Sequence, residues 1–178
     1  NVVTAVSESL KQETLAHFKV KKDIQVVPNF IPTLEHLPTP DESQRMQYAR
    51  PEEPILCHIS NFRKVKRVED VIRIFEKVNQ TIPAKLLMVG DGPDRNRLVE
   101  LTKSLGVENA VSFCGWVSHT EVLGHMRSAD VMVFPSVREN GAGVVFEALA
   151  SGAVPVVADF GGPGDIVIPE VGYKVPLT

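Results

Sequence analysis

The 178-residue sequence is poor in cysteine, and this shortage excludes a class of protein. Its two cysteines, Cys57 and Cys114, stand in apolar runs and lack any CxxC or Cys/His ligand spacing. A disulfide framework or a zinc site is therefore not expected. Both residues are predicted to be reduced core residues of a cytoplasmic protein.

Long apolar runs and an excess of one charge are also missing. No apolar segment approaches the roughly 18 residues of a bilayer-spanning helix, and no signal peptide is visible. The 19 basic and 22 acidic residues give a net charge of −3. Because no basic run is long, binding to nucleic acid is not expected. Peripheral membrane association of the full-length protein and its oligomeric state stay open.

Signatures of hydrolytic and metal-dependent catalysis are absent too. There is no recognisable Ser/His/Asp or Cys/His triad, and no HExxH, DxD or EF-hand pattern, so we expect no bound metal and no cofactor. The content of 43% apolar and 23% charged residues is typical of a soluble globular protein. The chain lacks a first methionine and stops after a predicted strand, so we expect it to be a piece of a longer protein.

Short apolar strands alternate with helices along most of the chain. The predicted strands are 55–60, 85–90, 111–115, 130–136 and 153–159. The segments between them carry helical apolar stripes or capping signals. This alternation predicts an α/β fold, a Rossmann-like parallel sheet with helices on both faces. Right-handed crossovers then place every strand-to-helix loop along one edge of the sheet, where open α/β sheets bind ligands.

The start of the chain has a different organisation. Two strands, at 2–6 and 23–29, flank a helix at 7–18. The following stretch is rich in proline and has little periodicity, which predicts a linker. We therefore divide the chain into an N-terminal segment, 1–32, a linker, 33–54, and a main domain, 55–178.

A glycine-bearing turn between a strand and a helix, 138–149, is the most informative stretch. Gly141 and Gly143 remove side chains where a ligand approaches, and the amides that begin the helix favour a phosphate. Glu139 and Glu147 frame the turn about two helical turns apart, a spacing that suits recognition of separate hydroxyl groups. The same pattern also fits glycines that only close a turn and a solvated glutamate.

Other loops on the same edge add cations, further glycines and an aromatic ring. The loop 60–67 carries four cations, although such a run is also typical of a charged surface. Glycine-rich turns follow at 90–93 and 160–165, and Trp116 could pack internally or form a wall for an aromatic base. Together these loops suit a diphosphate that carries a sugar on one side and a nucleoside on the other.

The order of these motifs resembles the C-terminal half of the retaining nucleotide-sugar glycosyltransferases of the GT-B fold, the group 1 (family 4) type. The segment 58–68 is most similar to the N-acetylglucosaminyl malate synthase branch, whereas 141–145 and 159–164 look like another branch. The resemblance rests on the segments 27–32, 90–93 and 113–116, on Pro135 and Ser136, and on Lys66, Glu139 and Glu147.

The resemblance implies a role for each matching residue. Lys66 would bind the donor diphosphate, with Arg63 as a candidate second cation because Asn61 replaces the usual arginine. Glu139 would contact the transferred sugar and Glu147 the ribose. The remaining candidate nucleotide-binding residues are Gly90, Gly92, Gly115, Trp116, Val117, Gly141, Ala142, Gly143 and Val144.

The implied function is transfer of a hexosyl or N-acetylhexosaminyl group from a nucleotide-diphosphate sugar to an acceptor, with retention and without a metal. UDP is the first expectation for the nucleotide and GDP the second. Residues 1–32 would end the acceptor domain or join the two domains, and 55–178 would be the donor domain, truncated at its C-terminus. Its partner would be its own N-terminal domain, without which the fragment would be inactive. A non-catalytic nucleotide-binding module, a sugar-nucleotide epimerase and a phosphorylase remain alternatives.

Overall fold

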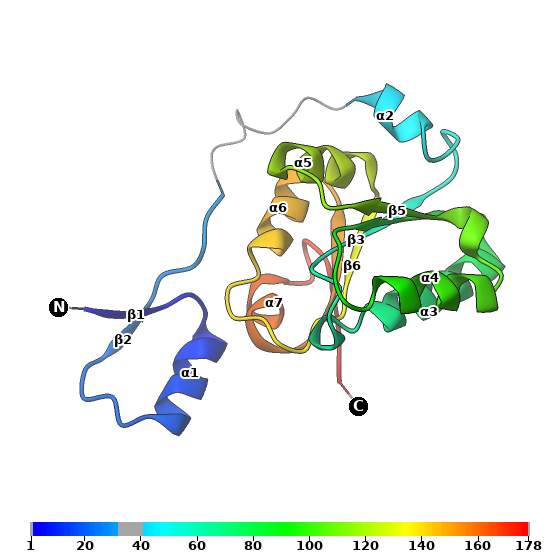
Figure 1. Ribbon diagram of the computed structural model, residues 1–178. Helices are drawn as coiled ribbons and strands as arrows, with labels where there is room; N and C mark the ends of the chain where they lie inside the picture. Colours follow the sequence, from blue (N-terminus) through cyan, green and yellow to red (C-terminus); the bar gives the residue numbers. More distant parts are fainter. Residues whose placement is uncertain (1, 32–40, 178) are drawn as a thin grey trace.

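A small unit of two strands and one helix opens the computed structural model, which describes residues 2–31 and 41–177 (Figure 1). Strand β1 (Val3–Ala5) pairs in parallel with β2 (Ile24–Val26), and helix α1 (Glu8–His17) joins them. The side chain of Ser7 accepts a hydrogen bond from the amide of Leu10 over 3.1 Å and so caps α1. The predicted strand–helix–strand start is confirmed.

The main body is a sheet of six parallel strands in the order β5-β4-β3-β6-β7-β8. The predicted Rossmann-like sheet is therefore confirmed. The strand order reverses between β3 and β6, and such a reversal leaves a crevice at the carboxyl ends of the strands. The strands are β3 (Ile55–Ile59), β4 (Lys85–Val89), β5 (Val111–Gly115), β6 (Val131–Phe134), β7 (Val154–Ala158) and β8 (Tyr173–Val175).

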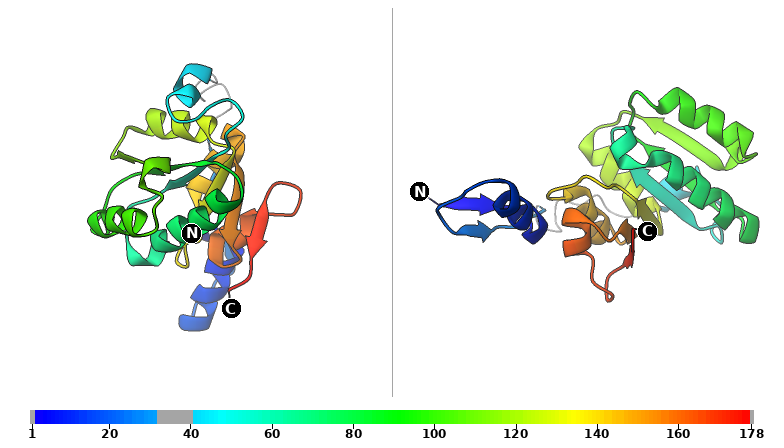
Figure 2. Two further views of the ribbon diagram at one scale, coloured as in Figure 1. Left: turned by 90° about the vertical axis from the view of Figure 1, so that its right-hand side faces the viewer. Right: turned by 90° about the horizontal axis from the view of Figure 1, so that it is seen from below.

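Helices cover both faces of this sheet, as predicted (Figures 1 and 2). Helices α3 (Val68–Thr81) and α4 (Arg95–Ser104) lie on one face. Helices α5 (His119–Ser128), α6 (Gly143–Ser151) and α7 (Gly161–Ile166) lie on the other. The start of α5 is fixed by a reciprocal capping box between Ser118 and Glu121.

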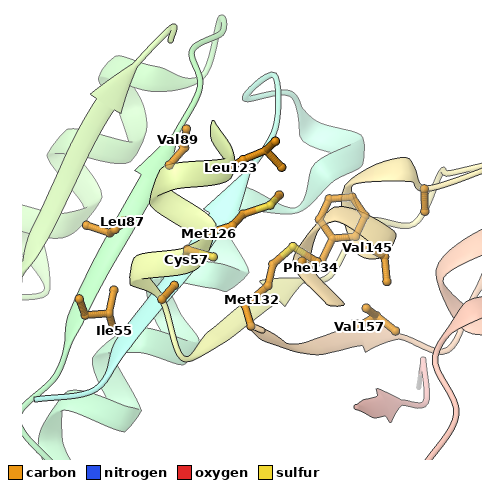
Figure 3. Packing of buried hydrophobic residues seen from close by; sticks show 14 of the residues in the cluster. Ile55, Cys57, Leu87, Val89, Leu123, Met126, Met132, Phe134, Val145 and Val157 are labelled. Carbon is orange, nitrogen blue, oxygen red and sulfur yellow. The ribbon is translucent and has the colours of Figure 1, made fainter. Parts of the chain in front are cut away.

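Each face of the sheet has its own hydrophobic core, because side chains alternate along a strand. Ile55 and Cys57 of β3 pack toward α5 and α6, together with the residues in Figure 3, whereas Leu56 packs toward α3 and α4. Burial raises the pKa of the Cys57 thiol to about 12. Cys57 is buried, as expected of a core residue, while Cys114 is only partly buried.

The stretch assigned to a linker contains an unpredicted helix, α2 (Glu42–Met46), which packs on α5. Asp41 caps it, and Arg45 anchors it by donating to the carbonyl of Ser128 over 2.6 Å and pairing with Asp130 over 3.0 Å. No residue of α2 is buried, so the helix has no apolar stripe that a sequence pattern could reveal. The linker residues 33–40 lie outside the described part of the chain.

The glycine-rich segment 160–165 was predicted to be a loop, and this prediction was wrong, because it forms most of α7. Gly162 and Pro163 are buried against the chain that follows β6. A Cβ atom on Gly162 would lie 2.3 Å from the carbonyl oxygen of Asn140. Glycine is therefore needed here for close packing of a helix on a loop, and tertiary contacts override its weak helix propensity.

Candidate functional site

A cavity of about 520 Å³ opens at the carboxyl ends of β3, β4, β5 and β6. It therefore lies at the reversal of strand order, the position where open α/β sheets bind ligands. Nine of the residues selected from the sequence line it. They are Lys66, Gly90, Trp116, Val117, Glu139, Ala142, Gly143, Val144 and Glu147.

One end of the cavity holds an ion pair between Lys66 and Glu139. Both side chains are largely withdrawn from solvent, at 18% and 17% exposure. Lys66 Nζ lies 5.8 Å from the centre of the Phe134 ring, and Ser136 Oγ lies 3.3 Å from Glu139 Oε1. The sequence-based prediction that Lys66 and Glu139 would converge is met by this contact.

Backbone contacts hold the two loops that carry this ion pair. Lys66 ends a short 3₁₀ turn, which Arg67 closes in the left-handed region at φ 51°. The carbonyl of Val65 accepts from the amide of Val137 over 3.1 Å and from Ser136 Oγ over 3.2 Å. The loop after β3 is thereby fastened directly to the loop after β6.

Helix α7 supports Glu139 from the other side. The amide of Gly162 donates to the carbonyl of Glu139 over 3.0 Å. Gly161 has φ 58°, and a Cβ atom at this position would lie 2.7 Å from the same carbonyl oxygen. The two glycines thus allow the backbone of α7 to approach and fix the loop that presents the Glu139 carboxylate.

The N-terminus of α6 faces the cavity without a side-chain cap. Ala142 is the residue before the helix, and it has a left-handed backbone, φ 37° and ψ 51°, that costs a residue other than glycine about 1–2 kcal/mol. Among the described residues no side chain hydrogen-bonds to this helix start. Gly143 and Val144 line the cavity there, so their amides and the helix dipole favour an anion.

The opposite end of the cavity is more open to water. Glu147 Oε1 lies 3.0 Å from His119 Nε2, and the exposed fractions of their side chains are 23% and 64%. Trp116, at 82% exposure, stands at the rim. This end therefore offers a carboxylate acceptor next to an exposed aromatic face.

Four predicted site residues do not line the cavity. Arg63 is exposed and does not line the cavity, whereas Asn61 does. Gly92 packs instead on Phe62, whose backbone nitrogen and oxygen would both lie 2.6 Å from an added Cβ. The structure therefore does not bring these two residues to the cavity, and their roles in binding stay predictions.

The other two are glycines with a structural explanation. Gly115 ends β5 at φ 72°, and its carbonyl accepts from the amide of Gly90 over 2.9 Å. A Cβ on Gly141 would lie 2.3 Å from the side chain of Asn29, so this glycine lets the turn pack on the N-terminal unit. Both shape the loops without reaching the cavity.

Several lining residues were not selected from the sequence as site residues. They are Ile59, Ser60, Asn61, Val89, His119, Val122 and Phe134. Position at a strand end was an available signal for Ser60 and Asn61, which directly follow β3. His119 had no such signal, because only the fold brings the start of α5 next to Glu147.

The model of one protein family, "Glycosyl transferases group 1", matches residues 40–176 of the chain. The chain belongs to this family. Among curated group 1 relatives, the N-acetyl-alpha-D-glucosaminyl L-malate synthase of Bacillus anthracis is 41% identical over 172 residues. That match covers 96% of this chain and 43% of the relative, so the chain spans less than half the length of that enzyme.

Solved structures of GT-B glycosyltransferases share the fold. HepE of Anabaena, in complex with UDP and glucose, has a TM-score of 0.86 at 20% identity, over 98% of this chain and 49% of that protein. The pneumococcal O-GlcNAc transferase GtfA, in complex with UDP and GlcNAc, has a TM-score of 0.75 at 19% identity, over 96% and 32%. The chain thus has the architecture of one half of a GT-B enzyme.

Within residues 2–31 and 41–177, no group of three or more His, Cys, Asp or Glu side chains is arranged to hold a metal ion. Over the same ranges, none of the helices combines the length and apolar character needed to cross a bilayer.

Proposed function

We propose that this chain is the donor half of a retaining glycosyltransferase that moves a hexosyl or N-acetylhexosaminyl group from a UDP-sugar to an acceptor. The observation that carries the proposal is one cavity that combines the Lys66–Glu139 pair, the uncapped start of α6 and Glu147. The name of the Bacillus anthracis relative supports an N-acetylglucosaminyl group, and the UDP bound to HepE and to GtfA supports a UDP-linked donor.

Each part of the donor has a complementary part of the cavity. The diphosphate binds Lys66 and the amides of Gly143 and Val144, because these are the cation and the free donors of the cavity wall. Glu139 accepts from sugar hydroxyls and Glu147 from the ribose, since a carboxylate only accepts. Glu139 pairs with Lys66, so a diphosphate that binds Lys66 takes the place of this carboxylate.

The reaction breaks the bond between the anomeric carbon and the phosphate oxygen, and the electron pair leaves with the diphosphate. The acceptor hydroxyl forms the new bond to that carbon and releases its proton. Negative charge therefore develops on the leaving group, where Lys66 and the start of α6 stabilise it. Preorganised groups of this kind contribute about 2.7–4 kcal/mol each to transition-state stabilisation. This chemistry uses no metal.

The N-terminal unit is proposed to belong to the acceptor side. It contacts the donor domain through Ser9, whose amide and hydroxyl both donate to Asp165 of α7 over 2.8 Å. In this arrangement 1–32 ends the acceptor domain, 33–54 connects the domains and 55–178 binds the donor. The free cysteines favour action in the cytoplasm.

Titration calorimetry tests the donor-binding part of this proposal on the chain itself. UDP and a UDP-sugar are expected to bind more tightly than GDP, and Lys66→Ala is expected to weaken both. Lys64→Ala is the matched control, because Lys64 lies in the same 3₁₀ turn but outside the cavity lining. An equal loss of nucleotide affinity in the two variants, or no nucleotide binding by the unaltered chain, would contradict the proposal.

The transfer step needs the protein that also contains the acceptor domain. Formation of a glycoside from a UDP-sugar with retained configuration is the expected result. Interconversion of the donor sugar without any acceptor would indicate an epimerase instead, and binding without turnover would indicate a nucleotide-binding module.

A further inference from the structure

A histidine lies buried directly behind the cavity wall. His58, on β3, is fully buried, and its ring stacks on Phe134 with centroids 6.0 Å apart. Its Nδ1 lies 2.9 Å from the carbonyl oxygen of Val133, on the neighbouring strand β6. Its Nε2 lies 2.7 Å from the hydroxyl oxygen of Ser60, which lines the cavity.

The proton positions in this chain of contacts follow from hydrogen-bond chemistry. A carbonyl oxygen only accepts, so Nδ1 must carry a proton and donate to Val133. In a neutral imidazole the other nitrogen then has no proton and accepts. Ser60 must therefore donate its only hydroxyl proton inward to Nε2.

The surroundings keep the imidazole neutral. Burial lowers the pKa of His58 to about 4, and the positive charge of Lys66 acts in the same direction, while the bond to Val133 opposes both. The assignment of protons thus holds at every pH near neutrality. It also makes His58 a poor base, so a nucleophilic role for Ser60 is not favoured.

Because the Ser60 hydroxyl donates its proton to His58 Nε2, Ser60 can bind only certain groups of a ligand. Its oxygen presents only lone pairs to the cavity, so it accepts hydrogen bonds and cannot donate one. A diphosphate has oxygen acceptors but no donor, and it would gain nothing from this group. A hydroxyl group of a sugar or ribose supplies the missing proton.

We propose that His58 is a positioning residue that makes Ser60 a fixed hydrogen-bond acceptor for a hydroxyl group of the bound nucleotide sugar. The inference rests on the proposed function and adds a specificity determinant to that site. It assigns Ser60 to recognition of a hydroxyl and not to binding of the diphosphate, although Ser60 and Lys66 line the same cavity.

The test pairs protein variants with ligands that lack single hydroxyl groups. Ser60→Ala is expected to weaken binding of the ligand that carries the partner hydroxyl by about ten-fold, within the range for one hydrogen bond. The matching deoxy ligand should bind Ser60→Ala and the unaltered chain equally, because the interaction is already lost. UDP, 2′-deoxy-UDP and 3′-deoxy-UDP examine the ribose. If Ser60→Ala loses affinity for UDP-N-acetylglucosamine but not for UDP, the partner hydroxyl belongs to the transferred sugar.

His58→Phe separates the positioning role from a contact of Ser60 alone. Phenylalanine keeps an aromatic ring beside Phe134 but removes the acceptor, so the Ser60 hydroxyl is free to rotate and to donate. The discrimination between hydroxyl and deoxy ligands should therefore fall part of the way toward that of Ser60→Ala. Nitrogen NMR of the unaltered chain with labelled histidine gives a readout that needs no variant. At pH 7, His58 should show a protonated Nδ1 and a bare Nε2.

Three results would overturn the inference. The first is a proton on His58 Nε2 at pH 7. The second is unchanged binding of every ligand by Ser60→Ala. The third is an equal loss of affinity of Ser60→Ala for all ligands, inorganic pyrophosphate included. The last would mean that Ser60 donates to the diphosphate. Failure of the unaltered chain to bind any nucleotide would instead contradict the proposed function, and the NMR result would stand apart from it.

Discussion

The two ends of the cavity are built differently. At one end, Lys66 and Glu139 are mostly buried and their loops are joined through the backbone at Val65 and Val137. At the other end, Glu147 is paired with His119, which is 64% exposed, beside the still more exposed Trp116. The first end is closed and charged, and the second is open and partly aromatic.

This difference indicates a division of work between the ends. Opposite charges interact more strongly where water is excluded, so the closed end suits stabilisation of charge that develops during a reaction. A hydrogen bond typically contributes only about 0.5–1.5 kcal/mol, so the open end suits recognition of a ligand by shape and by hydrogen bonds. The following predictions test the division, beginning with the closed end.

The largest effect is expected from Lys66→Ala in the protein that contains both domains. Loss of the cation that faces the leaving group should lower kcat by about 100-fold or more. The measurement is steady-state sugar transfer, with Lys64→Ala as the control that keeps near-normal activity. Near-normal turnover of Lys66→Ala would remove the distinction between the two ends.

The closed end should also make the stability of the fold depend on pH through His58. Its pKa in the folded chain is lowered from 6.5 to about 4, so the unfolded chain binds the proton more readily. Stability is then fully present above pH 6.5 and is lost as the pH falls toward 4, by roughly 2 kcal/mol between pH 7 and pH 5.

Chemical denaturation at the two pH values measures this contribution. His58→Phe should remove most of the difference. His125, whose pKa burial also lowers, contributes equally to both proteins and cancels in the comparison. A pH dependence that is identical in the variant would show that His58 titrates normally.

At the open end, Glu147→Gln should weaken UDP binding by about ten-fold, because a charge-assisted hydrogen bond becomes a neutral one. Turnover at saturating donor should change little. Calorimetry and kcat together check this split. A large fall in kcat would place Glu147 functionally with the closed end.

The smallest effect is expected from Trp116→Ala. Removal of an aromatic face at an exposed rim should cost about 1 kcal/mol, or about five-fold in affinity for UDP, and should leave inorganic pyrophosphate unaffected. Competitive titration with pyrophosphate measures both. An equal loss for the two ligands would mean that Trp116 holds the loop and not the base.

Much of the sheet and of the loops that line the cavity was predictable because their signals are local. Strand and helix periods, the capping serines and the position of Lys66 and Glu139 in loops that follow strands are all properties of short segments. Parallel topology then places the strand-to-helix loops on one edge. These steps predicted the sheet and its covering helices, and the family resemblance added the nine lining residues.

Other features depend on contacts between distant segments. Arg63 and Lys66 belong to the same short loop, yet only Lys66 lines the cavity, where it contacts Glu139 of a distant loop. Helix α7 forms from a glycine-rich segment because it packs on the chain after β6. Neither result follows from the residues of one segment.

By itself, the sequence determined an α/β sheet with a cation, amides and two carboxylates along one edge, since periodicity and turn chemistry act over a few residues. Only the tertiary structure decided which loops touch. Because β6 lies beside β3, Lys66 meets Glu139 across 73 residues of chain, and His58 meets Val133 across 75. Packing of the whole sheet determines which strands are neighbours. The neighbouring strands in turn determine which charged side chains pair in the cavity and which nitrogen of His58 carries the proton.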